Sequence, residues 1–365
     1  MIDFQTQRYA FLALAAAALF GASTPLAKLL LADVSPIMLA GLLYLGSGLG
    51  LLLWRFGGAI LHPSPQGRGD GGGGKPEPSA ANPRSAQFVW LAVAVLCGGV
   101  LAPIFLLWGL VQISAASAAL LLNLESVATT VIAAVIFSEQ VGRRVWVATL
   151  LMLVAGGVLS WQPHTSIPLS IGALAIVVAC VFWGLDNNFT RKISGGDAMQ
   201  IATVKGLAAG CVNVVIALST GAAFPPVNHL MAALLLGAFA YGVSLVLYVR
   251  ALRHLGSART GAHFATAPFV GAAIALGLGE HPGLIFIPAL ALMAVATWLL
   301  LTEHHAHRHV HEPMSHTHEH VHDEHHHHAH DPSVQSGQPH THLHEHEALT
   351  HFHPHLPDLH HRHSH

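Results

Sequence analysis

Ten long apolar stretches follow one another along the chain, and short polar segments separate them. A helix needs about 20 apolar residues to cross the hydrocarbon core of a bilayer, because each residue rises about 1.5 Å and every backbone group must be bonded within the segment. The pattern therefore predicts ten membrane-spanning helices. They cover residues 9–31, 35–54, 88–111, 114–138, 145–161, 168–189, 197–219, 231–250, 256–279 and 284–302.

The composition agrees with a membrane protein. Only 9% of the residues are charged and 53% are hydrophobic, whereas an ordinary soluble domain is about 25% charged. The chain therefore has too little polar surface to cover a globule in water. We expect an all-α polytopic membrane protein whose first partner is the lipid bilayer.

The loop charges predict the orientation of the ten helices. Alternate connections carry Lys and Arg, whereas the connections at residues 32–34, 112–113, 162–167, 220–230 and 280–283 contain neither. Cytoplasmic loops of membrane proteins carry the excess of Lys and Arg. We therefore expect a multi-pass protein of the cell inner membrane with both termini in the cytoplasm. The basic connections carry Arg8, Arg55, Arg68, Lys75, Arg84, Arg143, Arg144, Arg191, Lys192, Arg250 and Arg253.

Two low-complexity regions interrupt this plan. A Gly-, Pro- and Ser-rich linker occupies residues 55–87, and a tail at 304–365 holds 25 of the 31 histidines in 62 residues. Neither region has enough apolar residues to form a core, so we expect both to be disordered. The predicted domains are residues 1–163, 164–303 and the tail.

The two predicted domains share sequence landmarks. Phe-Gly-Ala-Ser at residues 20–23 has a counterpart in Trp-Gly-Leu-Asp at 183–186, and Asn-Leu-Glu-Ser at 123–126 corresponds to Phe-Ala-Thr-Ala-Pro at 264–268. Each domain would cross the membrane five times, so the second copy enters from the opposite side. This is the inverted-repeat arrangement of many secondary transporters. Gly206 and Gly210, four residues apart, predict close helix packing.

These landmarks resemble the drug/metabolite transporter superfamily, in its EamA-type branch. The resemblance rests on Phe-Gly-x-Ser-Thr-Pro-x-x-Lys at residues 20–28, on Asn-Leu-Glu at 123–125, and on the acidic residues Glu139 and Glu280 that end two of the stretches. It covers about residues 9–302. The family often has Pro where this chain has Ser126, while Pro268 keeps it in the second domain. The resemblance implies a carrier that moves small organic solutes, commonly outward, by ion-driven alternating access.

Glu125 is the first candidate for the transport site. A charged group near the bilayer centre costs at least about 2.5–3.5 kcal/mol, so it should face a polar cavity or a partner. Glu125 lies near the midpoint of the fourth stretch, with Asn123 in the same motif. It could take up and release a coupling proton, or it could be a structural carboxyl group bonded between helices.

Asp186 and Asn187 form a second polar group with Asn188, and at least one of the three must face other helices or a cavity. They could bind a solute, or Asp186 could pair with Arg191 and Lys192 at the lipid headgroups.

Three further side chains have two interpretations each. His263 could relay protons with Glu125 because histidine titrates near neutral pH, or it could make an ordinary bond between helices. Lys28 lies near the outer surface and could gate the transport path. Lys205 is expected to extend along its apolar stem to the cytoplasmic surface.

The tail predicts metal binding. Neutral imidazole is a good ligand for Zn, Ni and Co, and a flexible chain can close several side chains on one ion. Such binding could collect, store or sense metal, and a solvated polar tail would also bind metal without a role. The candidate ligands are His304, His305, His307, His316, His318, His320, His325, His326, His327 and His328.

The leading functional hypothesis is an ion-coupled exporter of small metabolites, amino-acid-like or drug-like, that needs no cofactor. The alternatives are efflux of divalent Ni, Co or Zn, and a membrane-anchored metal buffer or sensor. Enzyme activity is not expected, because there is no nucleophile–base pair and no phosphate-binding glycine loop. We expect a small-molecule substrate and no nucleic-acid partner, and a homodimer stays open.

Overall fold

The computed structural model describes residues 4–61, 84–136, 141–161, 170–192, 198–302, 306–311, 314–320, 340–346 and 349–354. The chain divides into two units, Met1–Thr302 and Glu303–His365. The first unit is helical in its described residues, whereas the described residues of the second form short strands.

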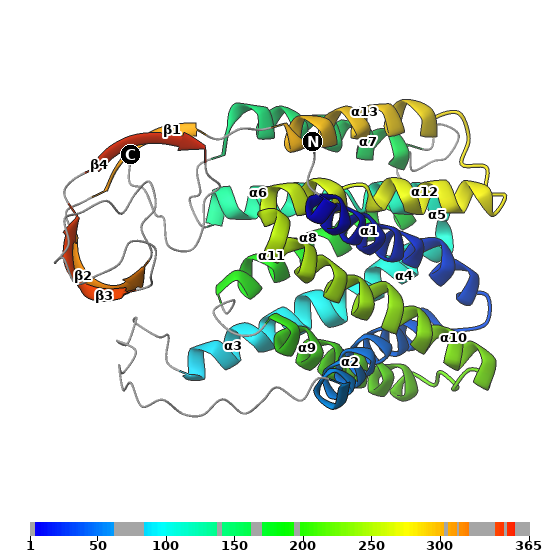
Figure 1. Cartoon of the computed structure of the whole chain (residues 1–365). Helices are drawn as coiled ribbons and strands as arrows, with labels where there is room; N and C mark the ends of the chain where they lie inside the picture. The colour runs from blue at the N-terminus through cyan, green and yellow to red at the C-terminus, as the bar shows by residue number, and fades with distance from the viewer. Residues whose placement is uncertain are drawn as a thin grey trace. The chain divides into compact units, whose positions relative to one another are not determined.

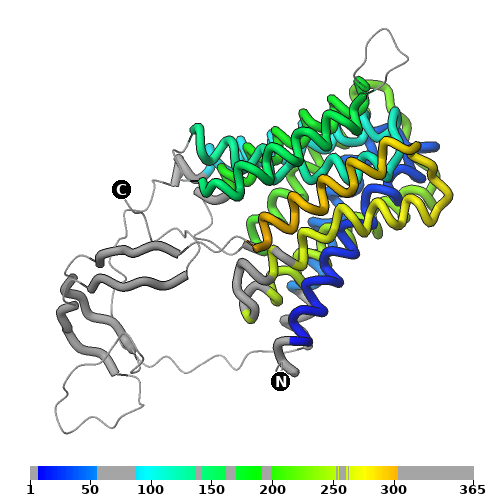
Figure 2. Tube along the Cα trace, turned by 90° about the horizontal axis from the view of Figure 1, so that it is seen from above, coloured from blue at the N-terminus to red at the C-terminus, as the bar shows by residue number. Residues whose placement is uncertain are grey.

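The helices of the first unit run roughly parallel or antiparallel to one another (Figures 1 and 2). In the described residues, eight helices are long and apolar enough to cross a membrane, and two apolar helices are shorter. The expected all-helical polytopic membrane protein is therefore confirmed. The uninterrupted long helices are α1 (Phe4–Leu30), α2 (Pro36–Leu61), α7 (Arg143–Ser160), α8 (Ile171–Lys192) and α9 (Ala198–Ser219), and the shorter two are α12 (Ala267–Gly277) and α13 (Phe286–Leu301).

Three spans are built from consecutive segments. Two of them contain a π-helix, a wider turn in which the backbone bonds reach five residues back. The third is broken in its middle at Leu122 and Asn123. The segments are α3 (Arg84–Ala94), η1 (Val95–Leu101) and α4 (Ala102–Gln112); α5 (Ala115–Leu121) and α6 (Leu124–Ile136); and α10 (Val227–Gly237), η2 (Ala238–Val243) and α11 (Ser244–Phe264).

Helix α11 folds back on itself. The rings of Tyr248 and Phe264 lie 5.0 Å apart between centroids, whereas residues 16 positions apart in a straight helix are separated by about 24 Å. The chain must therefore reverse direction between them. The last part of α11 and α12 together correspond to the ninth predicted stretch, residues 256–279.

Small residues bring helices of the two predicted domains into contact. A Cβ atom on Gly206 would lie 3.0 Å from the backbone nitrogen of Gly48, and one on Gly210 would lie 2.6 Å from Leu45. Helices α2 and α9 thus meet through backbone, which confirms the packing expected for these two glycines. A Cβ on Gly21 of α1 would lie 2.2 Å from the carbonyl oxygen of Ala267.

The boundaries of the low-complexity regions differ from the prediction. Helix α2 continues to Leu61 and α3 already begins at Arg84, because the apolar residues at 56–61 extend the helical pattern. The linker expected at 55–87 is therefore shorter at both ends, and its residues 62–83 lie outside the described part.

The described tail residues form strands, where the sequence analysis expected disorder. β1 (Ala306–His311) pairs with β4 (Leu349–Pro354), and β2 (Met314–His320) pairs with β3 (His340–His346), both antiparallel. Histidine alternates here with other residues, including β-branched Thr and Val, which fit a pleated strand. The other tail residues are not described.

The contact between α2 and α10 gives a test of this packing. A Cβ on Gly46 would lie 2.1 Å from the carbonyl oxygen of Leu234, so Gly46→Ala should lower the free energy of unfolding by about 1–3 kcal/mol. Thermal unfolding in detergent micelles measures the change. Gly157→Ala is the matched control, because its Cβ would meet nothing within 4 Å. Equal stability of the two variants would contradict the packing.

Candidate functional site

The break between α5 and α6 positions Glu125 in the first turn of α6. The chain tightens here, because Asn123 N bonds Leu120 O at 3.0 Å and Glu125 N bonds Leu122 O at 3.1 Å, three residues back instead of four. The Asn123 side chain supports the break, since its Nδ2 donates to Leu120 O at 3.0 Å. Asn123 is buried, and the same Nδ2 also lies 3.8 Å from Met293 Sδ of α13.

Glu125 meets α8 through Asn187. Asn187 Nδ2 donates to Glu125 Oε1 at 2.9 Å and also lies 3.2 Å from Thr129 Oγ1. Asn188 Nδ2 donates to the backbone oxygen of Thr129 at 3.2 Å. Glu125 is half-buried and Asn187 is exposed, so the surrounding helices do not seal the pair. The structure therefore brings together two of the predicted site residues, one from each predicted domain.

Asp186 is bound to Lys205 of α9. The Lys205 Nζ lies 2.5 Å from Asp186 Oδ1, and Thr190 Oγ1 donates to the same oxygen at 2.9 Å. Both charged side chains are mostly enclosed, with exposed fractions of 16% for Lys205 and 9% for Asp186. The expectation that Lys205 reaches the membrane surface was wrong, because Asp186 one helix away offers a charged partner. The side chains of Arg191 and Lys192 lie outside the described part.

Backbone carbonyls of η1 hold three side chains nearby. Tyr44 OH donates to Gly98 O at 2.6 Å, and Trp183 Nε1 donates to the same oxygen at 3.0 Å. Asn213 Nδ2 donates to Gly99 O at 2.8 Å. These three donors come from α2, α8 and α9, so η1 joins helices of both predicted domains.

Aromatic rings continue from Tyr44 into the second predicted domain. The Tyr44 and Tyr241 rings stack with centroids 6.1 Å apart, and Tyr241 contacts Phe20 edge-on at 5.6 Å. Phe264 lies 5.4 Å from Phe20 and 5.0 Å from Tyr248. We call these five residues the aromatic cluster. They gather aromatic ring faces between helices of the two predicted domains.

His263 does not join the site through a direct bond. Among the hydrogen bonds of the described residues, none links His263 to Glu125. The His263 backbone oxygen accepts from Thr266 Oγ1 at 2.6 Å and from Thr266 N at 3.2 Å. The proposed proton relay between His263 and Glu125 thus stays a prediction without a contact to support it.

Lys28 and Glu280 lie together at one end of the bundle. Lys28 Nζ donates to Leu110 O at 2.7 Å and to Ile113 O, which are carbonyls at the end of α4. The Glu280 carboxylate accepts from Ala115 N at 3.0 Å and from Ala116 N at 2.9 Å at the start of α5. A cation at a helix C-terminus and an anion at an N-terminus are both favourable. Lys28 therefore contacts the end of α4, and its gating role stays a prediction. Glu139 lies outside the described residues.

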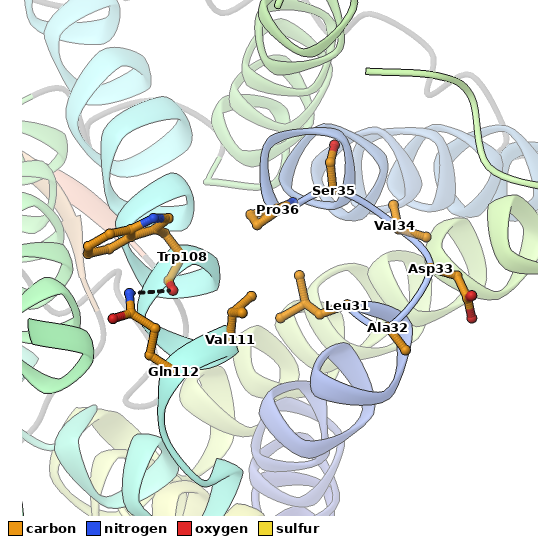
Figure 3. A pocket seen from close by; sticks show the side chains of 9 residues that line it. All are labelled: Leu31, Ala32, Asp33, Val34, Ser35, Pro36, Trp108, Val111 and Gln112. Carbon is orange, nitrogen blue, oxygen red and sulfur yellow. Dashed lines mark hydrogen bonds between the residues drawn. The ribbon is translucent and has the colours of Figure 1, made fainter. Parts of the chain in front are cut away.

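A pocket of about 550 Å³ opens beside the turn between α1 and α2. Figure 3 shows this turn, residues 31–36, facing Trp108, Val111 and Gln112 of α4. None of the predicted site residues lines it. The pocket is therefore separate from the group around Glu125.

Metal ligation finds no support within the helices. Among the described residues, no group of three or more His, Cys, Asp or Glu side chains could hold a metal ion. The tail histidines are not covered by that statement, because their side chains lie outside the described part.

Sequence reasoning missed Tyr44 and Trp183 and misplaced Lys205. Trp183 opens the Trp-Gly-Leu-Asp landmark, so the comparison of the two domains could have marked it. Lys205 is a charge inside a span, and the cost of such a charge predicts a partner. Tyr44 lies 54 residues before Gly98, and no local pattern indicates that contact.

The fold and the polar groups held between its helices define a polytopic helical membrane protein with a polar site inside the bundle. The model of the EamA-like transporter family matches residues 7–161 and again residues 170–302. The chain belongs to this family, and it is a membrane transporter, not an enzyme.

Two individual proteins are similar to the chain. An uncharacterized transporter of Methanothermobacter thermautotrophicus is 26% identical over 271 residues, which cover 72% of this chain and 77% of that protein. A solved crystal structure aligns with a TM-score of 0.56 and 16% identity, covering 80% of this chain and 95% of the other. The second likeness shows the fold alone.

The Asp186–Lys205 pair gives a test of the site's electrostatics. Lys205→Met leaves the enclosed Asp186 carboxylate without its cation and should lower the free energy of unfolding by about 3 kcal/mol. The double variant Lys205→Met/Asp186→Asn removes both charges and should recover most of the loss. Thermal unfolding in detergent micelles measures both. The pairing is contradicted if the double variant is as unstable as the single one.

Proposed function

We propose that this transporter exports small organic metabolites, amino-acid-like or drug-like, by ion-coupled alternating access. Glu125 is the group that takes up and releases the coupling proton. The observation that carries this proposal is the bond from Asn187 to Glu125, which joins α6 of the first family match to α8 of the second. A group at this junction senses any movement of one half against the other.

The partners of the two carboxyl groups favour Glu125 over Asp186 as the proton site. Asp186 is bonded to the cation Lys205, so protonation would leave that lysine without its counter-charge. Glu125 accepts a bond from a neutral amide. Protonation of Glu125 therefore breaks no ion pair among the described contacts, and it removes a charge that is costly inside the membrane.

The solute is proposed to lie against the aromatic cluster next to this carboxyl group. Tyr44 of this cluster and Trp183 both donate their polar hydrogen to Gly98 O. Their ring faces are left for apolar or cationic parts of a solute. The polar group of the solute would then bind at the Glu125–Asn187 pair, whose side chains are bonded to each other in this structure.

The rest of the arrangement follows the sequence analysis. We propose that residues 1–163 and 164–303 are the two inverted repeats, that both termini are cytoplasmic, and that the tail at 304–365 binds divalent metal as an accessory. Metal efflux is the less favoured alternative, because the described helices contain no group of three or more metal-binding side chains.

Proteoliposomes carrying a pH-sensitive dye test the role of Glu125. Adding proteinogenic L-amino acids or simple amines, one at a time, should release protons through the wild-type protein for at least one solute. Glu125→Gln should abolish this solute-driven proton flux, since an amide cannot bind and release the proton. Asp33→Asn is the control, because Asp33 is an exposed carboxylate at the bundle end. Undiminished flux through Glu125→Gln would remove the residue from the mechanism.

Truncation after Glu303 separates the tail from the transport unit. The truncated protein should keep the solute-driven proton flux, because the family matches end at residue 302. It should lose binding of Ni and Zn in isothermal titration. Metal efflux would instead be supported if truncation abolished Ni movement into the vesicles while the full chain supported it.

A further inference from the structure

A π-helix occurs at the same place in each half of the protein. η1 lies in the third span of the first family match, and η2 lies in the third span of the second. Each π-helix packs on the opposite half: Gly99 of η1 meets Ala209 of α9, and Gly242 of η2 meets Ser47 of α2. π-Helices are rare and frequent at functional sites. Because the π-helix occurs in both halves, it belongs to the repeated unit of the fold.

The bonding pattern of η1 places backbone oxygens where side chains can use them. Gly98 O accepts from both Tyr44 and Trp183, and Gly99 O accepts from Asn213. The Tyr44 and Trp183 rings of the proposed solute site are thus both held by the Gly98 carbonyl group of η1.

The missing side chain of Gly98 makes room for Asp186. A Cβ on Gly98 would lie 1.9 Å from Asp186 Oδ2 and 2.3 Å from its Cγ. The carboxylate therefore occupies the space that any other residue would fill. The 2.5 Å contact between Asp186 and Lys205 depends on this space.

The position of Asp186 is passed on to Glu125 by chain connectivity. Asp186 and Asn187 are consecutive residues of α8, and Asn187 is the residue that bonds Glu125. A displacement of the α8 backbone at Asp186 away from Gly98 would move the neighbouring Asn187 amide as well. Gly98 thus contacts the Tyr44 and Trp183 side chains directly. It is connected to Glu125 indirectly, through helix α8.

We propose that Gly98 is a positioning residue for transport, which holds the Asp186–Lys205 pair, the Tyr44 and Trp183 rings and, through Asn187, the Glu125 carboxyl group in one arrangement. This inference rests on the proposed function of that site. Gly98 itself binds neither the proton nor the solute. It acts by leaving room for the Asp186 side chain and by accepting bonds at its backbone oxygen.

The experiment compares Gly98→Ala with Gly242→Ala. A Cβ on Gly242 would lie 3.4 Å from Ser47 O, an ordinary contact, so this variant changes the other π-helix without a clash. In the proteoliposome assay with amino acids and amines, Gly98→Ala should lower the solute-driven proton flux by about tenfold or more. Gly242→Ala should leave it unchanged.

Two readouts separate positioning from a general loss of structure. Gly98→Ala should move the pH dependence of the flux in the same direction as Lys205→Met, because both break the same ion pair. Gly98→Ala should also lower the melting temperature in the wild-type background, and much less in the Asp186→Ala background, where the carboxylate is gone and only the Cβ at 2.7 Å remains.

The outcomes decide the two proposals separately. Normal flux through Gly98→Ala, or the same loss of melting temperature in both backgrounds, overturns the positioning role even if Glu125→Gln is inactive. If the wild-type protein shows no solute-driven proton flux, the proposed function fails. The melting-temperature comparison then still decides whether Gly98 and Asp186 are coupled.

Discussion

Inside the hydrocarbon of a membrane, every polar group has to find its partner within the protein, because no water is there to replace a missing bond. The Asp186–Lys205 pair is the clearest result of this constraint, with two enclosed charges 2.5 Å apart on neighbouring helices. The amide of Asn213 meets it in part, because its Nδ2 donates to Gly99 O, while its buried Oδ1 has no hydrogen-bond partner among the described residues. At the helix ends, Lys28 bonds the last carbonyls of α4, and Glu280 accepts from the first amides of α5. Polar bonds of this kind fix which helices stand next to each other.

The same constraint supports the proposal that the site works as a proton switch. A charge that is fully paired is stable but fixed, as Asp186 is. Glu125 is held by a neutral amide instead, so its charge can be gained or lost without leaving a described cation behind. The two carboxyl groups lie on adjoining helices, and the consecutive residues Asp186 and Asn187 link them. One of them anchors the arrangement, and we propose that the other changes with the transport cycle.

Much of the fold could be predicted from hydropathy alone, because each span must carry about 20 apolar residues. The site was predictable in part. Glu125 and Asn187 were found because a polar side chain inside a membrane span is costly unless it has a partner or a function. The partner of Asp186 was not found, since the nearby cations of the loop were equally available in sequence. The fold-back of α11 and the strands of the tail likewise depend on contacts between distant residues.

The two π-helices show where sequence patterns stop being informative. A π-turn differs from an α-turn by the register of its backbone bonds, and the apolar residues of η1 and η2 fit either form. The Gly-Gly pair at 98–99 carried no prediction in the sequence. The contact from Tyr44 spans 54 residues, and only the folded chain brings the two together.

The central claim is that Glu125 changes its protonation state when a solute binds. Infrared difference spectra of the protein in lipid nanodiscs, recorded with and without a solute that drives proton flux, report this directly through the carbonyl stretch of a protonated carboxyl group. We expect a band that changes on solute addition and is absent from the Glu125→Gln spectrum. A spectrum with no such change, or with the same band in Glu125→Gln, would contradict it.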